Sequence, residues 1–124
     1  MNHQMPEILS LAAGAARHAA QRQAVVSVNV ANADTPGFKA RDLAAFDPDR
    51  SDFALRRTRS GHLGEANAGH QINVLRDLPT DPNGNNVDLE DQVLRGIEAA
   101  RRHDRAVTVY RNALDLMRAA LGRR

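Results

Sequence analysis

A regular spacing of apolar and small side chains near the C-terminus constrains the fold more than any other feature of the sequence. Between residues 88 and 121 these side chains recur at steps of three and four, and they are Val93, Gly96, Ala100, His103, Val107, Tyr110, Leu114, Met117 and Leu121. Such spacing is typical of a coiled-coil seam and predicts one long helix. Asp88 is expected to cap its first turn, where Glu90 and Asp91 complement the helix dipole.

A second helix is predicted near the N-terminus, from residue 6 to about residue 33. Pro6 suits the start of a helix, and the segment is rich in Ala, Leu, Arg and Gln, which favour helix formation. Its apolar stripe is narrow and is built mostly from small side chains: Leu9, Ala12, Ala16, Ala19, Val26 and Val30. We therefore expect close packing against one partner helix.

The apolar surface of the C-terminal helix is broader than this partner can cover. A further row widens it in the second half, formed by Ala106, Val109, Ala113, Leu116 and Ala120. A pair of helices would leave part of this surface in water, and large exposed apolar patches mark interaction sites. The sequence thus predicts that other chains cover it.

The middle of the chain, residues 35–86, has no such periodicity. It holds four of the five prolines and only short apolar fragments, "FAL" at 53–55 and "INVL" at 72–75. One or two short strands fit here. The predicted fold is mainly α: the helices of residues 1–34 and 87–124 pair as an elongated coiled-coil-like unit, and the irregular segment 35–86 has room for a short β-hairpin.

The residues that carry catalytic or metal chemistry are not arranged for it. Cysteine is absent, the five histidines show no pair at ligand spacing, and no nucleophile elbow or glycine-rich phosphate loop occurs. The segment 81–92 resembles a calcium loop in its first half only, because Asn86 and Gln92 replace the required Gly and Glu. We predict no catalytic residue, no cofactor and no metal, and hence no enzyme.

Net charge argues against a nucleic-acid partner. Seventeen Lys and Arg residues are balanced by fifteen Asp and Glu residues, which gives a formal charge of +2. The basic clusters at 56–59 and 101–103 lack the interleaved aromatic side chains that stack on bases. No stretch approaches the roughly 20 apolar residues that span a bilayer. We expect neither nucleic-acid binding nor a direct membrane span.

The stretch "VSVNVANADTPGFKARDL", residues 26–43, combines a helix end with a sharp turn. Thr35 precedes a proline and so leaves the helical region, while Pro36 and Gly37 suit the two central positions of a type II turn. Asn29 and Asn32 lie one helical turn apart, and we expect their amides to bond the backbone of a neighbouring chain. The stretch is therefore predicted to be a shaped corner at an interface.

Three sequence segments resemble those of the flagellar basal-body rod proteins. The strongest is "SVNVANADTPGFKARDL" at 27–43, followed in similar order by "TRSGHL" at 58–63 and "NGNNVDLEDQV" at 83–93. The short middle is similar to that of the proximal members of the family. The resemblance implies a structural subunit of the proximal rod, the shaft that transmits torque, which self-assembles through its terminal helices.

The resemblance also implies location and partners. The subunit would lie in the periplasmic rod of the basal body, exported by the flagellar type III apparatus without a cleaved signal peptide. Its neighbours would be other copies of itself, the rod protein FlgC, the adaptor FliE, the MS ring and the export gate. We expect its assembly interface to contain Val26, Asn29, Val30, Asn32, Asp34, Pro36, Gly37, Phe38, Arg41, Val93, Ala100, Val107, Tyr110, Leu114, Met117 and Leu121.

Two other interpretations remain open from the residues alone. The chain could be a small helical adaptor that pairs with a partner helix without forming a filament, or a basic nucleic-acid-associated protein. Polymerisation on a rod would distinguish a rod subunit from both of these alternatives. Salt-dependent binding to DNA would identify the nucleic-acid-associated protein.

Overall fold

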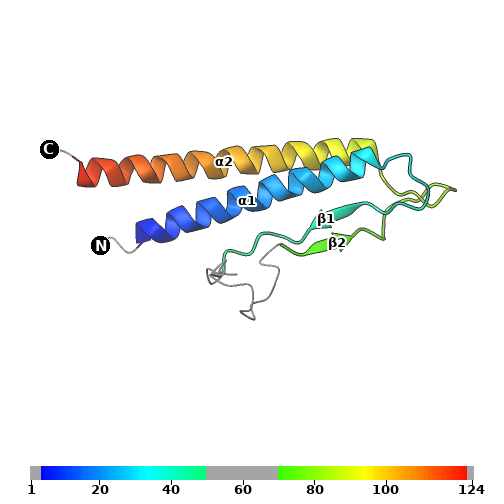
Figure 1. Ribbon diagram of the computed structural model, residues 1–124, viewed down its shortest axis with the longest axis horizontal. Helices are drawn as coiled ribbons and strands as arrows, with labels where there is room; N and C mark the ends of the chain where they lie inside the picture. Colours follow the sequence, from blue (N-terminus) through cyan, green and yellow to red (C-terminus); the bar gives the residue numbers. More distant parts are fainter. Residues whose placement is uncertain (1–3, 50–69, 123–124) are drawn as a thin grey trace, which may run out of the picture.

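Two long helices dominate the computed structural model, which describes residues 4–49 and 70–122. Helix α1 spans Gln4–Ala31 and helix α2 spans Leu89–Leu121, with the short strands β1 (Arg41–Leu43) and β2 (Ile72–Val74) between them in sequence. Figure 1 shows α1 and α2 side by side and antiparallel, with the strand pair lying along α1. The predicted fold, a mainly α pair of terminal helices with a small β element in the middle, is confirmed.

The start of α2 is fixed by the cap that the sequence predicts. The Asp88 carboxylate accepts hydrogen bonds from the backbone N–H groups of Glu90, at 3.0 Å, and Asp91, at 3.5 Å. Glu90 and Asp91 lie in the first turn and Arg118 in the last, so charges complement the helix dipole at both ends. Sequence and structure agree on this helix to within one residue.

The phase of the seam on α2 differs from the prediction by one residue. The side chains buried against α1 repeat every seven residues, as Gln92, Ala99, Ala106 and Ala113. Val93 is 57% exposed and Leu121 is 78% exposed, so neither lies in the seam of the single chain. The reason is that alanine lets the two backbones approach closely, and the larger side chains beside the alanine row are displaced to its edges.

Small side chains also form the seam of α1. Ala12 and Ala19 are buried as predicted, whereas Val30 is exposed. Val26 is half-buried, and a Cβ placed on Gly96 would lie 3.5 Å from its Cγ1, so the two helices meet closely there. Among the described residues the buried apolar side chains are Ala12, Ala19, Ala40, Leu43, Ala99, Ala106 and Ala113. A core of this kind buries little area per residue.

The described residues of the middle segment form one antiparallel strand pair. Arg41 pairs with Val74 and Leu43 with Ile72, and the ladder continues through the bond from the Ala44 N–H to the Gln71 carbonyl at 2.8 Å. The predicted strand at "INVL" is confirmed, but residues 44–71 separate the strands, so they form no tight hairpin. The fragments "FAL" and "TRSGHL" and the basic cluster at 56–59 lie outside the described residues. No helix in the described ranges is long and apolar enough to cross a membrane.

Candidate assembly interface and the corner beside it

The helix α1 ends in the turn that the sequence predicts. The Phe38 N–H donates to the Thr35 carbonyl at 3.2 Å, across Pro36 and Gly37, and Gly37 has a φ of 75°. Proline at the second position and a positive φ at the third are the features of a type II turn. The chain therefore reverses direction here, which brings β1 back along α1 (Figure 1).

A second glycine turn packs on the first. Residues 81–84 form it, with the Gly84 N–H donating to the Asp81 carbonyl at 2.8 Å and a φ of 86° at Gly84. The Gly37 N–H donates to the Asn83 carbonyl at 3.0 Å, and Lys39 donates from Nζ to the Gly84 carbonyl at 2.6 Å. The segments 27–43 and 83–93, both of which resemble those of the rod proteins, are thus in direct contact with each other.

Two buried asparagines join these turns to the rest of the chain. Asn85 donates from Nδ2 to the carbonyls of Asn32, at 2.9 Å, and Thr35, at 2.8 Å. Asn86 accepts from the Ala40 N–H at 2.6 Å and donates to the Leu75 carbonyl, also at 2.6 Å. Each side chain is almost fully buried and replaces backbone pairing in an irregular segment. We call this set of contacts, from residues 32–40 and 81–86, the corner.

The amide of Asn29 bonds within its own chain. It is fully buried, accepts from the Arg41 N–H at 3.0 Å, and donates to the Arg41 carbonyl at 2.7 Å and to Gln92 Oε1 at 2.9 Å. These bonds correct the expectation that Asn29 serves a neighbouring chain. Gln92 Nε2 is buried and has no hydrogen-bond partner among the described residues.

The amide of Asn32 is also used locally. Its Nδ2 donates to the Val28 carbonyl at 2.8 Å, and its Oδ1 accepts from the Thr35 hydroxyl at 3.1 Å. Both bonds lie at the C-terminal end of α1, where backbone carbonyls have no partner within the helix. Asn32 therefore helps to end the helix within its own chain, and its contact with a neighbouring chain stays a prediction.

An ion cluster around Asp42 connects β1 to both helices. Arg22 from α1 approaches it in a bidentate arrangement, with Nε 3.0 Å from Oδ1 and Nη2 3.1 Å from Oδ2. Arg95 from α2 donates to the same carboxylate and, from Nε, to Asp91 at 2.8 Å. Charge-assisted bonds of this geometry are among the stronger polar contacts in proteins.

The protonation state of this cluster follows from these contacts. Burial raises the pKa of Asp42, but hydrogen bonds from Arg22, the Leu43 N–H and Arg95 outweigh burial and hold the pKa below its usual range. The hydrogen bond to Asp42 in turn raises the pKa of Arg22. Asp42 is therefore ionised when the chain is folded, and it holds two cations that lie on different helices.

The residues expected at the assembly interface fall into three groups. Asn29 is buried. The half-buried residues, which line the edges of the helix pair or the corner, are Val26, Asn32, Phe38, Ala100, Val107, Tyr110, Leu114 and Met117. The exposed residues are Val30, Asp34, Pro36, Gly37, Arg41, Val93 and Leu121. The structure thus brings the corner residues together but separates them from the far end of α2, where Leu121 lies (Figure 1).

A broad apolar surface remains uncovered on α2. Leu89, Val93, Leu94 and Ile97 are exposed near its start, and Val109, Leu116 and Leu121 are exposed along its second half. Exposed apolar side chains that gather in this way mark a surface for contact with another chain. Of the further row predicted from the sequence, Val109, Leu116 and Ala120 are exposed, whereas Ala106 and Ala113 are buried in the seam between the two helices.

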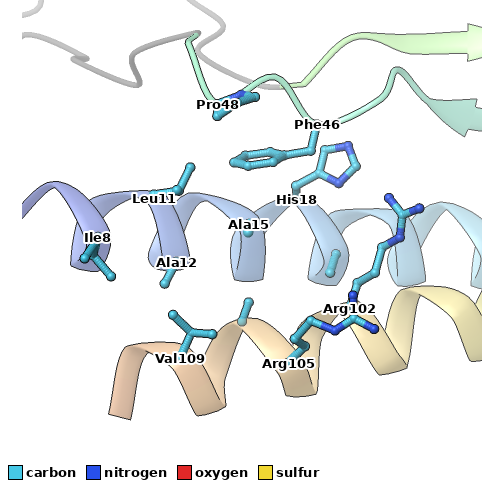
Figure 2. Close-up of a pocket in the computed structure, with 12 residues that line it drawn as sticks. Ile8, Leu11, Ala12, Ala15, His18, Phe46, Pro48, Arg102, Arg105 and Val109 are labelled. Atoms are coloured by element: carbon cyan, nitrogen blue, oxygen red, sulfur yellow. The ribbon is translucent and has the colours of Figure 1, made fainter. Parts of the chain in front are cut away.

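An apolar groove of about 450 Å³ lies between the helices, farther from the corner. Figure 2 shows Ile8 and Leu11 on α1, Val109 on α2, and Phe46 and Pro48 from the segment after β1 around it. His18 is buried beside it, donates from Nε2 to the Ala44 carbonyl at 2.7 Å, and packs against the Phe46 ring. These contacts hold Phe46 in place, so this wall of the groove has a defined position.

Sequence reasoning missed most of the polar residues that hold the chain in shape. These are Arg22, Asp42, Asn85, Asn86, Gln92 and Arg95. One signal was available: Gln92 stands seven residues before Ala99, in the same heptad position, where a polar residue is unusual. The partners of the others lie far away along the chain and leave no local pattern.

Comparison with known proteins shows which proteins this chain resembles. Residues 9–39 match the model of the family described as flagella basal body rod protein. The flagellar basal body rod protein FlgB of Agrobacterium fabrum is 32% identical over 108 residues, which cover 79% of this chain and 80% of the relative. FlgB of Salmonella typhimurium is 29% identical over 108 residues, covering 77% and 78%, and FlgB of Yersinia ruckeri is 29% identical over 115 residues, covering 82% and 84%.

The paired terminal helices, the uncovered face of α2 and these relatives together define a structural subunit of the bacterial flagellar basal-body rod. No observation favours the hypothesis of a free helical adaptor. The chain belongs to the FlgB family of flagellar basal body rod proteins. The resemblance noted in its sequence is therefore confirmed, and it extends over about four-fifths of the chain.

Proposed function

We propose that this chain self-assembles through its terminal helices in the proximal part of the rod and transmits torque there. The observation that carries this proposal is the apolar surface exposed on α2, where Leu94 is 66% exposed and Leu116 is 60% exposed. Contacts among copies would remove this surface from water and stabilise the assembly. In this account the corner supplies the fixed shape of the subunit, and the helix faces supply the contacts.

The interface in this proposal contains the exposed and half-buried residues predicted from the sequence, without Asn29. Exposed residues of the corner, such as Asp34 and Pro36, would contact a neighbour at one end of the subunit, and Leu121 would do so at the other. The half-buried Leu114 and Met117 lie at the edge of the helix pair, where a neighbouring helix would complete their burial. A subunit with contacts at both ends and along its side suits a continuous shaft.

We further propose that the partners are other copies of the chain, FlgC, FliE, the MS ring and the export gate, in the periplasmic rod that the type III apparatus supplies. The family supports this proposal through the position of its members in the basal body. The fold supports it by offering protein-binding helix faces.

The proposal is tested by locating the chain in purified basal bodies. Cells that lack the chain should form the MS ring but no rod, and antibody labelling of basal bodies from complemented cells should mark the base of the rod. Co-purification of FlgC and FliE with the chain after cross-linking would support the named partners. Rods of normal number and length in the deletion strain would contradict the proposed function.

A further inference from the structure

We propose that the groove between α1 and α2 binds the start of α2 from a second copy of this chain. The inference rests on the proposed function and makes it more specific, because it names two surfaces that meet. One is the groove, and the other is the exposed face at residues 89–97, which we call the α2 start. The argument depends on apolar match, on charge and on the positions of the two surfaces.

The groove is apolar inside and basic at one edge. Its floor is made of small residues such as Ala12 and Ala15, and its walls include the exposed Ile8 and Leu11. A floor of small residues leaves room for large aliphatic side chains from outside. Such a groove is the usual binding site for one face of an amphipathic helix.

Two arginines of α2 line the basic edge. Arg102 is already paired, with its Nη2 2.7 Å from Glu98. Arg105 makes no ion pair with any residue in the ranges 4–49 and 70–122. One positive charge beside an apolar groove therefore remains available to a partner.

The α2 start has the complementary composition. Leu94 is 66% exposed, and Val93 and Ile97 are exposed beside it. Glu90 precedes Leu94 by four residues and so lies on the same helical face. Its carboxylate forms no ion pair with the described residues. This surface offers aliphatic side chains and one unpaired negative charge, as the groove requires.

The two surfaces cannot meet within one chain. The α2 start lies next to the corner, whereas the groove lies toward the opposite end, where α1 begins (Figures 1 and 2). A contact between different surfaces of successive copies is heterologous and leaves a free groove and a free α2 start at the two ends of every open oligomer. The contact can therefore repeat, as a shaft requires.

Charge reversal tests the pairing of Glu90 with Arg105. We expect Glu90→Arg and Arg105→Glu each to weaken self-association at least 10-fold in sedimentation velocity of the purified full chain at low salt. An equimolar mixture of the two variants should recover association, because each restores the missing partner of the other. Circular dichroism of each variant controls for helix content, and Asp115→Asn, an exposed change on α2 away from both surfaces, should associate like the unchanged chain.

Each outcome of the mixing experiment either supports or overturns the proposed contact. Recovery in the mixture, with species heavier than a dimer at rising concentration, supports the proposal. Failure of the mixture to recover, association that stops at a dimer, or an unchanged chain that stays monomeric at every concentration overturns it. None of these results bears on whether the chain occurs in the rod, which the labelling of basal bodies measures separately.

Cross-linking provides a second test that does not depend on charge. The chain has no cysteine, so introduced thiols are the only ones present. Chains carrying Leu94→Cys and chains carrying Leu11→Cys should form a mixed disulfide under mild oxidation. Chains carrying Leu94→Cys and Leu121→Cys should do so at least 10-fold more slowly. Equal rates for the two mixtures would overturn the proposed contact.

Discussion

Gly84 lies against the backbone of Gly37, so closely that a Cβ on Gly84 would be 3.3 Å from the Gly37 Cα. Both residues have a positive φ, 75° at Gly37 and 86° at Gly84. Each turn therefore needs glycine because of its positive φ. At Gly84 there is a second reason, because a side chain there would press on the backbone of Gly37. This contact joins two segments that are 47 positions apart and sets the shape of the corner.

The first prediction follows from this difference between the glycines. Gly37→Ala should destabilise the chain by roughly 1–2 kcal/mol, because of the positive φ alone, since nothing lies within 4 Å of a Cβ there. Gly84→Ala should be more destabilising, because its Cβ also presses on the backbone of Gly37. Valine should be worse than alanine at either position. Urea unfolding measures all four variants, and equal effects of the two alanine variants would contradict the packing described.

The second prediction concerns the buried amide pair. Asn29→Leu removes three hydrogen bonds and leaves the N–H and the carbonyl of Arg41 without these partners, which should cost about 1–3 kcal/mol. Gln92→Leu removes one bond together with a donor that has no partner, so it should cost less. Urea unfolding of both single variants and of the double variant gives the coupling between them. A larger loss from Gln92→Leu would contradict this assignment.

The third prediction is a dependence of stability on pH. The folded pKa of Asp42 is lowered, so its contribution to the free energy of unfolding is present above about pH 4, the pKa of an unfolded Asp, and is lost as pH falls through the lowered value. Asp42→Asn should destabilise the chain at pH 7 by roughly 1–3 kcal/mol, between exposed and buried ion pairs. Thermal unfolding from pH 7 to pH 2 should show that the difference in melting temperature between the unchanged chain and Asp42→Asn becomes smaller as the pH falls.

The fourth prediction concerns local stability within the isolated chain. The polar contacts gather at the corner end, whereas the distant halves of the helices meet mainly through Ala12, Ala19, Ala106 and Ala113. Hydrogen exchange of dilute monomer should therefore be fast in residues 4–15 and 106–121 and slower in residues 22–30 and 88–99. Assembly should then protect the distant halves. Uniform protection along both helices of the monomer would contradict this expectation.

The parts of the fold that sequence predicts well are those with local signals. The period of α2, the cap at Asp88 and the Pro36-Gly37 turn each depend on residues within one or two turns of each other, and each is confirmed. The strand at "INVL" is found for the same reason, because a short apolar run between turn residues is a local pattern.

The parts that sequence misplaces depend on distant partners. Asn29 appeared available to a neighbouring chain because Gln92, its partner 63 positions away, cannot be known from the spacing. The buried row of α2 lies one residue before the row predicted at Val93, Ala100, Val107 and Leu114, because alanine contributes little to a hydrophobic pattern and the larger Val93 dominates it. The ion cluster of Arg22, Asp42 and Arg95 likewise joins three separate elements.

The fifth prediction uses Leu114, at the edge of the helix pair. Leu114→Asp should abolish rod assembly at normal protein levels, because a charge would be buried at the subunit contact without a counter-ion. Swimming in soft agar, with the protein level followed by immunoblot, measures the effect. Normal swimming of this strain would show that the edge of the helix pair lies outside the contact.

The central claim, that the uncovered face of α2 builds the rod, is tested most directly by counting basal bodies in electron micrographs of cells that carry Leu116→Asp. Leu116 is exposed in the single chain, so the substitution should leave the fold intact and act only on assembly. Leu116→Met keeps an apolar side chain of similar size at the same position and serves as the matched control. The account predicts basal bodies without complete rods for Leu116→Asp and normal counts for Leu116→Met. Normal counts for both, at equal protein levels, would contradict it.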